Sequence, residues 1–350
     1  MSVAPLRLDV HQHIWTEPLL AALERRDELP FVRREHGLKV LFLAGERPYV
    51  IERSSETPAH RASLVHEDGL DGALICLSSP LGIEALARCE AIPLLDAYHE
   101  GALGLGRPFG VWGALALDGS GPEDVERLLN DGCVGLSLPA GALGSLAGLA
   151  RLRGVLEALE GADAPLLVHP GPGREDTRAA TRVYTDQPSL SDPLWWSALT
   201  RYVSEMHAAW LALVGAGRAE HPRLRIVFSM LAGLAPLHVE RLLSRGGPPA
   251  PAADPLIFYE TSSYGPAAVG QLAASVGVEQ LLYGSDRPVA DPAQHGLLLT
   301  LDWTQVSRAA RRALGQAAPT PVRPARPSRD PREHGGESWV RARQEGATVS

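Results

Sequence analysis

The chain has 350 residues, of which 45% are apolar and 21% are charged, and its formal net charge is −8. A chain of this size can bury a large core, since about 250 residues suffice for an α/β barrel. The negative charge argues against non-specific binding to nucleic acid. No long apolar run and no basic segment leading into an apolar one occurs, so the sequence predicts a cytoplasmic protein without a membrane span or a secretory signal.

The first strand is predicted at residues 6–10, and an insertion of about residues 14–70 separates it from the next clear strand. Within this insertion, residues 30–34 and 38–43 are predicted to form a hairpin, and residues 58–69 a helix. An insertion after the first strand of a barrel lies over its mouth, so we expect this segment there.

From residue 72 onward, short apolar strands alternate with amphipathic helices, which is typical of βαβ units and a parallel sheet. Together with the first strand this rhythm gives eight strands, and eight units favour a closed (β/α)8 TIM barrel over an open sheet. Neither a Gly-x-Gly-x-x-Gly turn nor a Gly-Lys-Ser/Thr motif occurs, so dinucleotide and P-loop binding are not indicated. The later strands are predicted at 72–77, 110–117, 133–138, 165–169, 224–229, 256–261 and 280–283, and the helices at 80–103, 122–130, 149–160, 194–220, 237–245, 266–276 and 303–314.

The predicted barrel domain spans residues 1–315, and the composition changes after it. Residues 317–336 are dense in Pro, Arg and Gly, with almost no large apolar side chain. Such a segment cannot bury enough surface to offset the entropy lost on ordering. We therefore expect residues 316–350 to form a disordered tail.

The cysteines, Cys76, Cys89 and Cys133, are odd in number and widely spaced. This arrangement suits buried, reduced thiols better than a disulfide framework or a zinc knuckle. We therefore expect all three to be structural thiols.

Three apolar runs lead to side chains that can bind a metal ion. The first ends in His11 and His13, and because residues i and i+2 of a strand point to the same side, both imidazoles can chelate one ion. The second run ends in His169, and the third is followed by Asp286. The carboxyl ends of all strands of a parallel barrel meet at one face, so these four residues are predicted to converge there.

Three imidazoles and one carboxylate suit a single divalent ion, with zinc as the expected metal and manganese, iron(II) and cobalt as alternatives. Such an ion lowers the pKa of bound water and polarises a carbonyl group, and Asp286 could take the proton from that water. Each residue alone could equally make a structural hydrogen bond. The joint occurrence of all four at the ends of predicted strands favours the metal site.

Taken together, these motifs resemble the amidohydrolase superfamily. They look most like its amidohydrolase-related branch of metal-dependent barrels, which holds lactonases and aminocarboxymuconate semialdehyde decarboxylase. The resemblance covers about residues 6–314 and implies one divalent metal held by the residues matching His11, His13, His169 and Asp286. The stretches that carry it are Asp9-Val10-His11-Gln12-His13-Ile14-Trp15, Val168-His169-Pro170 and Gly284-Ser285-Asp286-Arg287-Pro288.

The sixth predicted strand departs from the family pattern. The family has a histidine there that orients or deprotonates water, whereas this chain has Met230, followed by Gly233 and Pro236. A thioether can neither give nor take a proton at neutral pH. Either Asp286 works alone as acid and base, or another group substitutes, or the activity is lost.

The resemblance also bears on the number of metal ions. Binuclear members of the superfamily bridge two ions with a carbamylated lysine at the end of the fourth strand. Here the only lysine, Lys39, lies in the insertion, and the fourth predicted strand ends without a lysine or a carboxylate. We expect a mononuclear site, with Glu260 of strand seven as the one group that could compensate.

Polar and aromatic side chains near the metal motifs are candidates for binding a substrate. Arg174 and Arg287 follow the second and third motifs, and an arginine fork recognises carboxylates, which are common on substrates of the resembling family. A surface ion pair is the alternative for each arginine, while Trp195 and Trp196 could line the pocket or form a homodimer contact. The predicted substrate-binding residues are Trp15, Arg174, Met230, Tyr264 and Arg287.

The predicted function is a hydrolase in which one metal ion activates water to attack an amide or lactone carbonyl, with Asp286 as the catalytic residue. Two alternatives remain open: a non-oxidative decarboxylase of an acidic substrate, and a catalytically silent barrel, as Met230 would permit. The expected partner is a small molecule, with a carboxylated compound as one option. A homodimer stays open, and neither nucleic acid nor a membrane is expected to bind.

Overall fold

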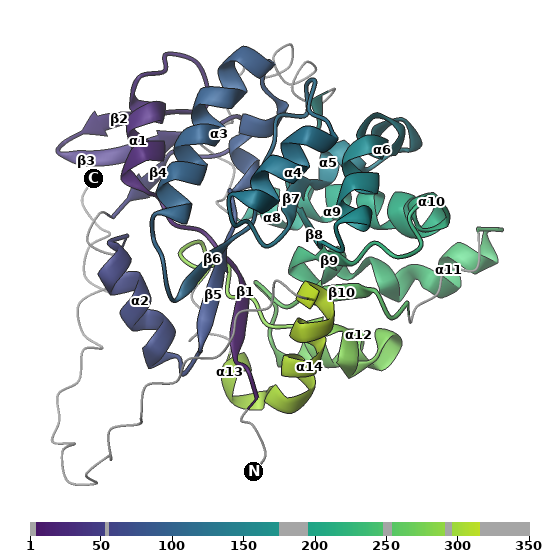
Figure 1. Ribbon diagram of the computed structural model, residues 1–350. Coiled ribbons are helices and arrows are strands. Elements are labelled where there is room, and N and C mark those ends of the chain that lie inside the picture. Colours follow the sequence, from purple (N-terminus) through teal and green to yellow (C-terminus); the bar gives the residue numbers. More distant parts are fainter. Residues whose placement is uncertain (1–4, 53–55, 175–194, 248–253, 291–295, 316–350) are drawn as a thin grey trace, which may run out of the picture.

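The computed structural model describes residues 5–52, 56–174, 195–247, 254–290 and 296–315, so the predicted tail, residues 316–350, lies outside the described residues. Helices surround a set of parallel strands, and an additional small sheet lies beside α1 (Figure 1). The strands are β1 (Leu8–Gln12), β2 (Phe31–Glu35), β3 (Leu38–Phe42), β4 (Tyr49–Ile51), β5 (Gly72–Ile75), β6 (Phe109–Val111), β7 (Leu136–Pro139), β8 (Leu166–His169), β9 (Ile226–Phe228), β10 (Ile257–Glu260) and β11 (Leu281–Leu282). The α-helices are α1 (Glu17–Glu24), α2 (Pro58–Glu67), α3 (Arg88–Leu103), α4 (Pro122–Asn130), α5 (Ala140–Leu143), α6 (Leu146–Gly161), α8 (Trp196–Leu199), α9 (Arg201–Ala212), α10 (Arg218–Glu220), α11 (Val239–Ser244), α12 (Pro266–Val276), α13 (Leu297–Thr300) and α14 (Trp303–Leu314).

The parallel strands pair in two sheets, in the orders β1-β5-β6 and β11-β10-β9-β8-β7. Single bridges connect the sheets at both seams, between Gly113 and Leu136 and between Gln12 and Arg287. All eight predicted strands are present in the predicted order, which confirms a parallel α/β fold. The predicted closed barrel is present only in part, because the hydrogen-bond ladder is interrupted at each seam.

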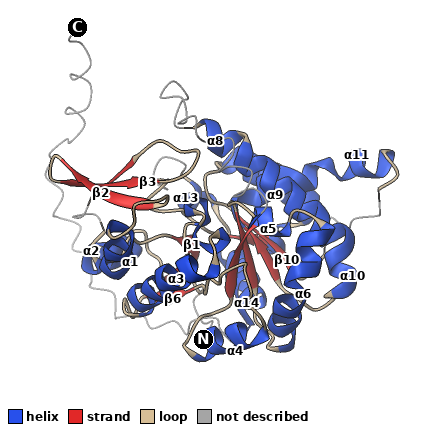
Figure 2. Cartoon of the chain, turned by 90° about the horizontal axis from the view of Figure 1, so that it is seen from above, coloured by secondary structure: helices blue, strands red, loops and turns tan. Residues whose placement is uncertain are grey.

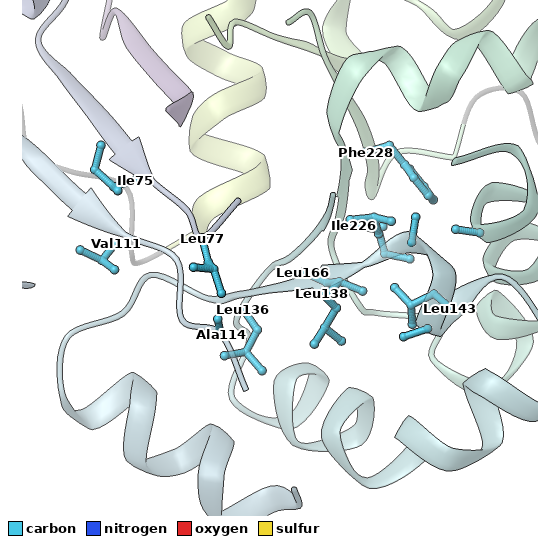
Figure 3. Packing of buried hydrophobic residues seen from close by; sticks show 14 of the residues in the cluster. Ile75, Leu77, Val111, Ala114, Leu136, Leu138, Leu143, Leu166, Ile226 and Phe228 are labelled. Carbon is cyan, nitrogen blue, oxygen red and sulfur yellow. The ribbon is translucent and has the colours of Figure 1, made fainter. Parts of the chain in front are cut away.

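The strands separate two apolar layers, because successive side chains of a strand point to opposite faces. Figure 3 shows side chains of the outer layer, among them Ile75, Val111 and Leu136, and this layer packs against the helices. Figure 2, seen from above, shows the parallel strands enclosed by helices, with β2 and β3 outside them. The residues of the inner layer, which we call the inner cluster, are Leu6, Leu8, Val10, Leu74, Cys76, Trp112, Leu167, Val227, Phe258 and Leu282, with Ala309, Ala310, Ala313 and Leu314 of α14.

The insertion after β1 contains the predicted hairpin and the predicted helix α2. The hairpin strands β2 and β3 pair antiparallel, from Phe31 opposite Phe42 to Glu35 opposite Leu38. Two further elements were not predicted, namely the third strand β4, which pairs with β3, and the helix α1. The only lysine, Lys39, is buried here and pairs with Glu17 of α1 at 3.0 Å, so it takes no part in the β7 strand end.

Two of the predicted helices are interrupted. Residues 80–103 begin as two short 3-10 turns, because Gly82 has a φ of 73° and ends the first of them, and α3 starts only at Arg88. Residues 194–220 include α8, α9, a π-helical turn at Leu213–Gly217 and α10, and the first residue of that range lies outside the described part. Within the described ranges, no helix is long and apolar enough to cross a membrane.

A left-handed turn follows β9. Five successive residues, 230–234, have φ between 42° and 67°, and only one of them, Gly233, is a glycine. Each non-glycine residue in this conformation costs about 1–2 kcal/mol, because Cβ approaches the following carbonyl oxygen. The surrounding packing must offset this cost, since Leu231 and Ala232 are fully buried.

Candidate metal centre

Three histidines point their Nε2 atoms at one another at the carboxyl ends of β1 and β8. The Nε2 atom of His11 lies 3.2 Å from that of His13 and 3.1 Å from that of His169. All three rings are almost perpendicular to one another, with centroids 4.9–5.1 Å apart. The register of β1 is irregular between Asp9 and Gln12, and such a bulge re-aims the side chains that follow it.

The carboxylate of Asp286 lies beside these nitrogens. Its Oδ1 atom is 3.1 Å from Nε2 of His13 and 3.6 Å from Nε2 of His11. The residue has a φ of 58°, and its N–H donates to the carbonyl of His11 at 3.0 Å, which fixes the loop after β11 against β1. The structure therefore brings together all four side chains that the sequence predicts as metal ligands.

The opposite nitrogen of each imidazole faces a hydrogen-bond acceptor. Nδ1 of His11 lies 2.8 Å from Oε2 of Glu260, that of His13 lies 2.9 Å from the carbonyl of Cys76, and that of His169 lies 2.8 Å from the carbonyl of Pro170. These acceptors assign the proton of each neutral ring to Nδ1 and leave a lone pair on Nε2. Three lone pairs and a carboxylate directed at one point fit a divalent cation, and this donor set suits zinc or manganese.

The charges around the histidines favour a cation at this point. Burial lowers the pKa of His11, but Cys76 and Glu260 outweigh burial and hold it well above its usual value. Burial also acts to lower the pKa of His13, but Cys76 and Asp286 outweigh burial and raise it to about 9. The surroundings of these two rings thus stabilise positive charge.

The third imidazole and the carboxylate respond to that charge. Burial lowers the pKa of His169 well below its usual value, and positive charge on His11 and His13 adds to the effect. Burial acts to raise the pKa of Asp286, but the hydrogen bond from His13 and the charge of His11 hold it below its ordinary range. Asp286 is therefore ionised at neutral pH and His169 is neutral, as metal ligation requires, whereas His11 and His13, whose pKa values are raised, must release a proton when an ion binds.

A buried arginine fixes the backbone of the histidine pair. Arg61 of α2 donates to the carbonyl of His13 at 2.7 Å and to the side chain of Gln12 at 2.7 Å, and it pairs with Glu56 at 3.1 Å. Only 1% of its surface is exposed. The insertion thus contributes to the site from outside the strands, a role that the sequence pattern did not reveal.

Two further buried groups near the strand ends were not predicted as part of the site. Cys76 follows β5, and its Sγ atom lies 3.6 Å from Nδ1 of His13; burial raises the pKa of this thiol, but His13 and His11 outweigh it and lower the pKa to about 7. Glu84 is completely buried, and burial raises its pKa to about 7. Cys76 could have been found by the rule that identified His169, since it also ends an apolar run.

The two predicted substrate-binding arginines already have carboxylate partners. Arg287 pairs with Asp68 of α2 at 2.8 Å, and Arg174 pairs with Asp118. A substrate carboxylate would have to compete with these partners, and the predicted role of both arginines in binding substrate stays a prediction.

The other predicted substrate-binding residues lie in different surroundings. Trp15 lines a cavity of about 400 Å³ between the starts of α1 and α2 and the end of α3, and none of the four predicted ligands lines that cavity. Met230 is partly buried, and its N–H donates to Oε2 of Glu260 at 3.3 Å. Tyr264 is partly buried against the outer layer. The roles of these three residues stay predictions.

Replacing Glu260 with glutamine should weaken metal binding by about 10–100-fold, the range typical for groups that orient a metal-ligating histidine. The carboxylate accepts the proton of His11 Nδ1, and an amide can do so with only one of its two terminal atoms. Competition with a coloured chelator would measure the change. Glu240→Gln, the same substitution at an exposed position of α11, is the control, and equal affinity for Glu260→Gln and the unaltered protein would contradict this assignment.

Glu84 should make folding stability depend on pH. Its pKa rises from 4.5 to about 7 on folding, so its contribution is fully present below pH 4.5 and is lost as the pH rises through about 7. The unaltered protein should lose about 3 kcal/mol of unfolding free energy through Glu84 between pH 4.5 and about pH 8. The glutamine of Glu84→Gln does not titrate, so the unfolding free energy of this variant should rise by that amount relative to the unaltered protein. Urea unfolding at several pH values would measure this difference. A flat difference between Glu84→Gln and the unaltered protein over this pH range would refute the effect.

Several solved structures share this fold, whereas no family profile and no curated protein sequence matches the chain. The 5-carboxyvanillate decarboxylase from Sphingomonas paucimobilis aligns with a TM-score of 0.67 at 16% identity, over 89% of this chain and 99% of that one. The 2,6-dihydroxybenzoate decarboxylase from Rhizobium gives 0.63 at 18% identity, over 89% and 99%. A manganese complex of 5-carboxyvanillate decarboxylase from Novosphingobium aromaticivorans gives 0.61 at 15%, over 89% and 96%. At these identities the likeness is one of fold, and it agrees with the resemblance to the amidohydrolase superfamily.

Proposed function

We propose that this chain, whose fold is that of amidohydrolase-related decarboxylases, is a metal-dependent carboxy-lyase that releases CO₂ from a small carboxylated substrate. One observation carries the proposal: three buried imidazoles, each with its Nδ1 held by an acceptor, direct their Nε2 atoms at one point beside Asp286. The decarboxylases among the structural neighbours support this reaction over the hydrolysis that the sequence favoured.

The number of groups able to move a proton also supports decarboxylation. Hydrolysis of an amide or lactone needs a base that takes a proton from water and an acid that protonates the leaving group. Loss of CO₂ leaves an electron pair on carbon, and that carbon needs a single proton. Met230 stands at the position of the expected histidine, and among the residues that the structure describes, Asp286 is the one carboxylate that contacts the Nε2 atoms.

The chain's own residues have separate tasks in this proposal. His11, His13 and His169 would hold the ion, which when bound supplies positive charge that binds the substrate's carboxylate and stabilises the charge developing as the bond to CO₂ breaks. Asp286 is ionised in the resting protein, so it must first gain a proton, from the substrate or from water, before it delivers that proton to carbon. The three imidazoles are only 2–4% exposed, so the side of the ion that they hold is shielded from bulk water, while the side chain of Asp286 keeps 16% of its surface exposed.

Turnover on defined substrates tests the proposal. Protein loaded with zinc, manganese, cobalt or iron(II) would be incubated with a panel of hydroxylated aromatic carboxylates, lactones and amides, with CO₂ and ring-opened products measured. We expect CO₂ release from at least one carboxylate and, in D₂O, one deuterium at the carbon that lost it. Hydrolysis without CO₂ release would overturn the proposed decarboxylation. A protein that binds one ion but turns over none of the compounds would instead support the alternative of a catalytically silent barrel.

A further inference from the structure

Cys76 approaches the three histidines from the end of β5, the strand next to that of His11. It follows β5, which pairs with β1, and its side chain belongs to the inner cluster with only 2% of its surface exposed. Ligand atoms of His11, His13, His169 and Cys76 all lie within 4.8 Å of one another. Asp286 contacts the same histidines from the loop after β11, on the other side of β1.

We propose that the Cys76 sulfur is a ligand of the ion held by His11, His13 and His169, so that the centre is an N₃S site that selects thiophilic metals. This inference rests on the proposed metal centre and adds a residue that the family pattern does not contain. The thiol loses its proton to solvent as the sulfur–metal bond forms, which leaves the charge of the site one unit lower than with a neutral fourth ligand.

The geometry of a tetrahedral site can accommodate this sulfur. Metal–nitrogen bonds of about 2.1 Å and metal–sulfur bonds of about 2.3 Å place the nitrogen and sulfur atoms roughly 3.6 Å apart. One ligand atom of each histidine and the sulfur of Cys76 lie within 4.8 Å of one another, and the 3.6 Å contact of the sulfur with His13 is to Nδ1, the nitrogen opposite Nε2. Shortening the separations between the sulfur and the Nε2 atoms to roughly 3.6 Å would complete the coordination.

Sulfur ligation has two chemical consequences. A thiolate favours zinc, cobalt(II) and iron(II) over manganese, which prefers oxygen ligands. With sulfur as the fourth ligand, the carboxylate of Asp286 is no longer needed to hold the ion. It is then free to carry the proton that the proposed reaction delivers to carbon.

The test uses protein in which Cys76 is the only thiol. The chain has three cysteines, so the double variant Cys89→Ser/Cys133→Ala leaves Cys76 alone. Cys89 is exposed, contrary to the expectation of a buried thiol, and neither Cys89 nor Cys133 belongs to the cluster of ligand atoms around the histidines. Metal-free protein receives one equivalent of cobalt(II), and its near-ultraviolet absorption is recorded. We expect a sulfur-to-cobalt charge-transfer band. Tight cobalt binding without the band would overturn sulfur ligation alone, whereas failure to bind cobalt or zinc would overturn the proposed metal centre as well.

A second measurement compares metal preference. Cys76→Ser should lower the ratio of zinc affinity to manganese affinity by about 10–100-fold, while Cys133→Ser, a substitution of another buried free cysteine, should leave it unchanged. An unchanged ratio in a folded Cys76→Ser protein would show that the sulfur does not touch the ion. Should Cys76→Ser fail to fold, the cobalt spectrum of the double variant still decides the question.

Discussion

Replacing His169 with alanine is expected to weaken binding of the metal ion by more than about 100-fold and to abolish turnover, because the loss of a ligand exceeds the effect of losing a group that only orients one. Its Nε2 atom lies 3.1 Å from that of His11, and the shortened side chain leaves a gap on the β8 side of the cluster. Two histidines would remain, both from β1 and the residues just after it.

Stability provides a readout of this variant that does not depend on activity. An ion at a thousandfold excess over its dissociation constant stabilises the folded chain by about 4 kcal/mol. The unaltered protein should gain that stability on addition of zinc, and His169→Ala should gain less than about 1.4 kcal/mol, because binding weakened by more than about 100-fold leaves at most about a tenfold excess of the ion. His221→Ala is the matched control, since His221 is also buried, at 3% exposure against 4% for His169. Equal stabilisation of both variants by zinc would show that His169 is not a ligand.

The second large effect is expected at Arg61. Arg61→Met should lower the unfolding free energy by about 3–5 kcal/mol, because it leaves the buried carboxylate of Glu56 without its partner and leaves the carbonyl of His13 without its donor. Urea unfolding would measure the loss, and metal titration should show a weaker site, since the backbone of His13 is no longer held.

A double variant separates the ion pair from the rest of this network. Arg61→Met/Glu56→Gln removes both charges and should recover part of the stability lost in Arg61→Met. Arg33→Met is the control, because Arg33 pairs with an exposed Asp27 and such pairs contribute less than about 1 kcal/mol. A loss below about 1 kcal/mol for Arg61→Met would contradict a structural role for the buried arginine.

The convergence of the four predicted ligands could be read from the sequence because it depends on local patterns. His11, His13 and His169 each end an apolar run, and the geometry of parallel strands brings such ends to one face. Asp286 follows the last strand in the same way. The strand count and order were predictable for the same reason, while the two interrupted seams depend on the register between strands, which the pattern does not encode.

Contacts between distant segments were beyond sequence reasoning. Arg61 lies in an insertion whose position depends on how the hairpin and α2 pack, and nothing in its neighbours identifies Gln12 and His13 as its partners. Arg287 was predicted to face a substrate because it follows Asp286, yet a carboxylate of α2, Asp68, lies 2.8 Å from it. Such pairings are decided by the packed chain and not by spacing.

The left-handed turn after β9 bears on which residues fit at position 230. The backbone there has a φ of 42°, a region where histidine, asparagine and aspartate are several-fold more common than other non-glycine residues. Histidine, the residue that the family pattern has at this position, is therefore at least as compatible with this backbone as methionine. Met230→His would accordingly add no backbone strain beyond that which Met230 already carries.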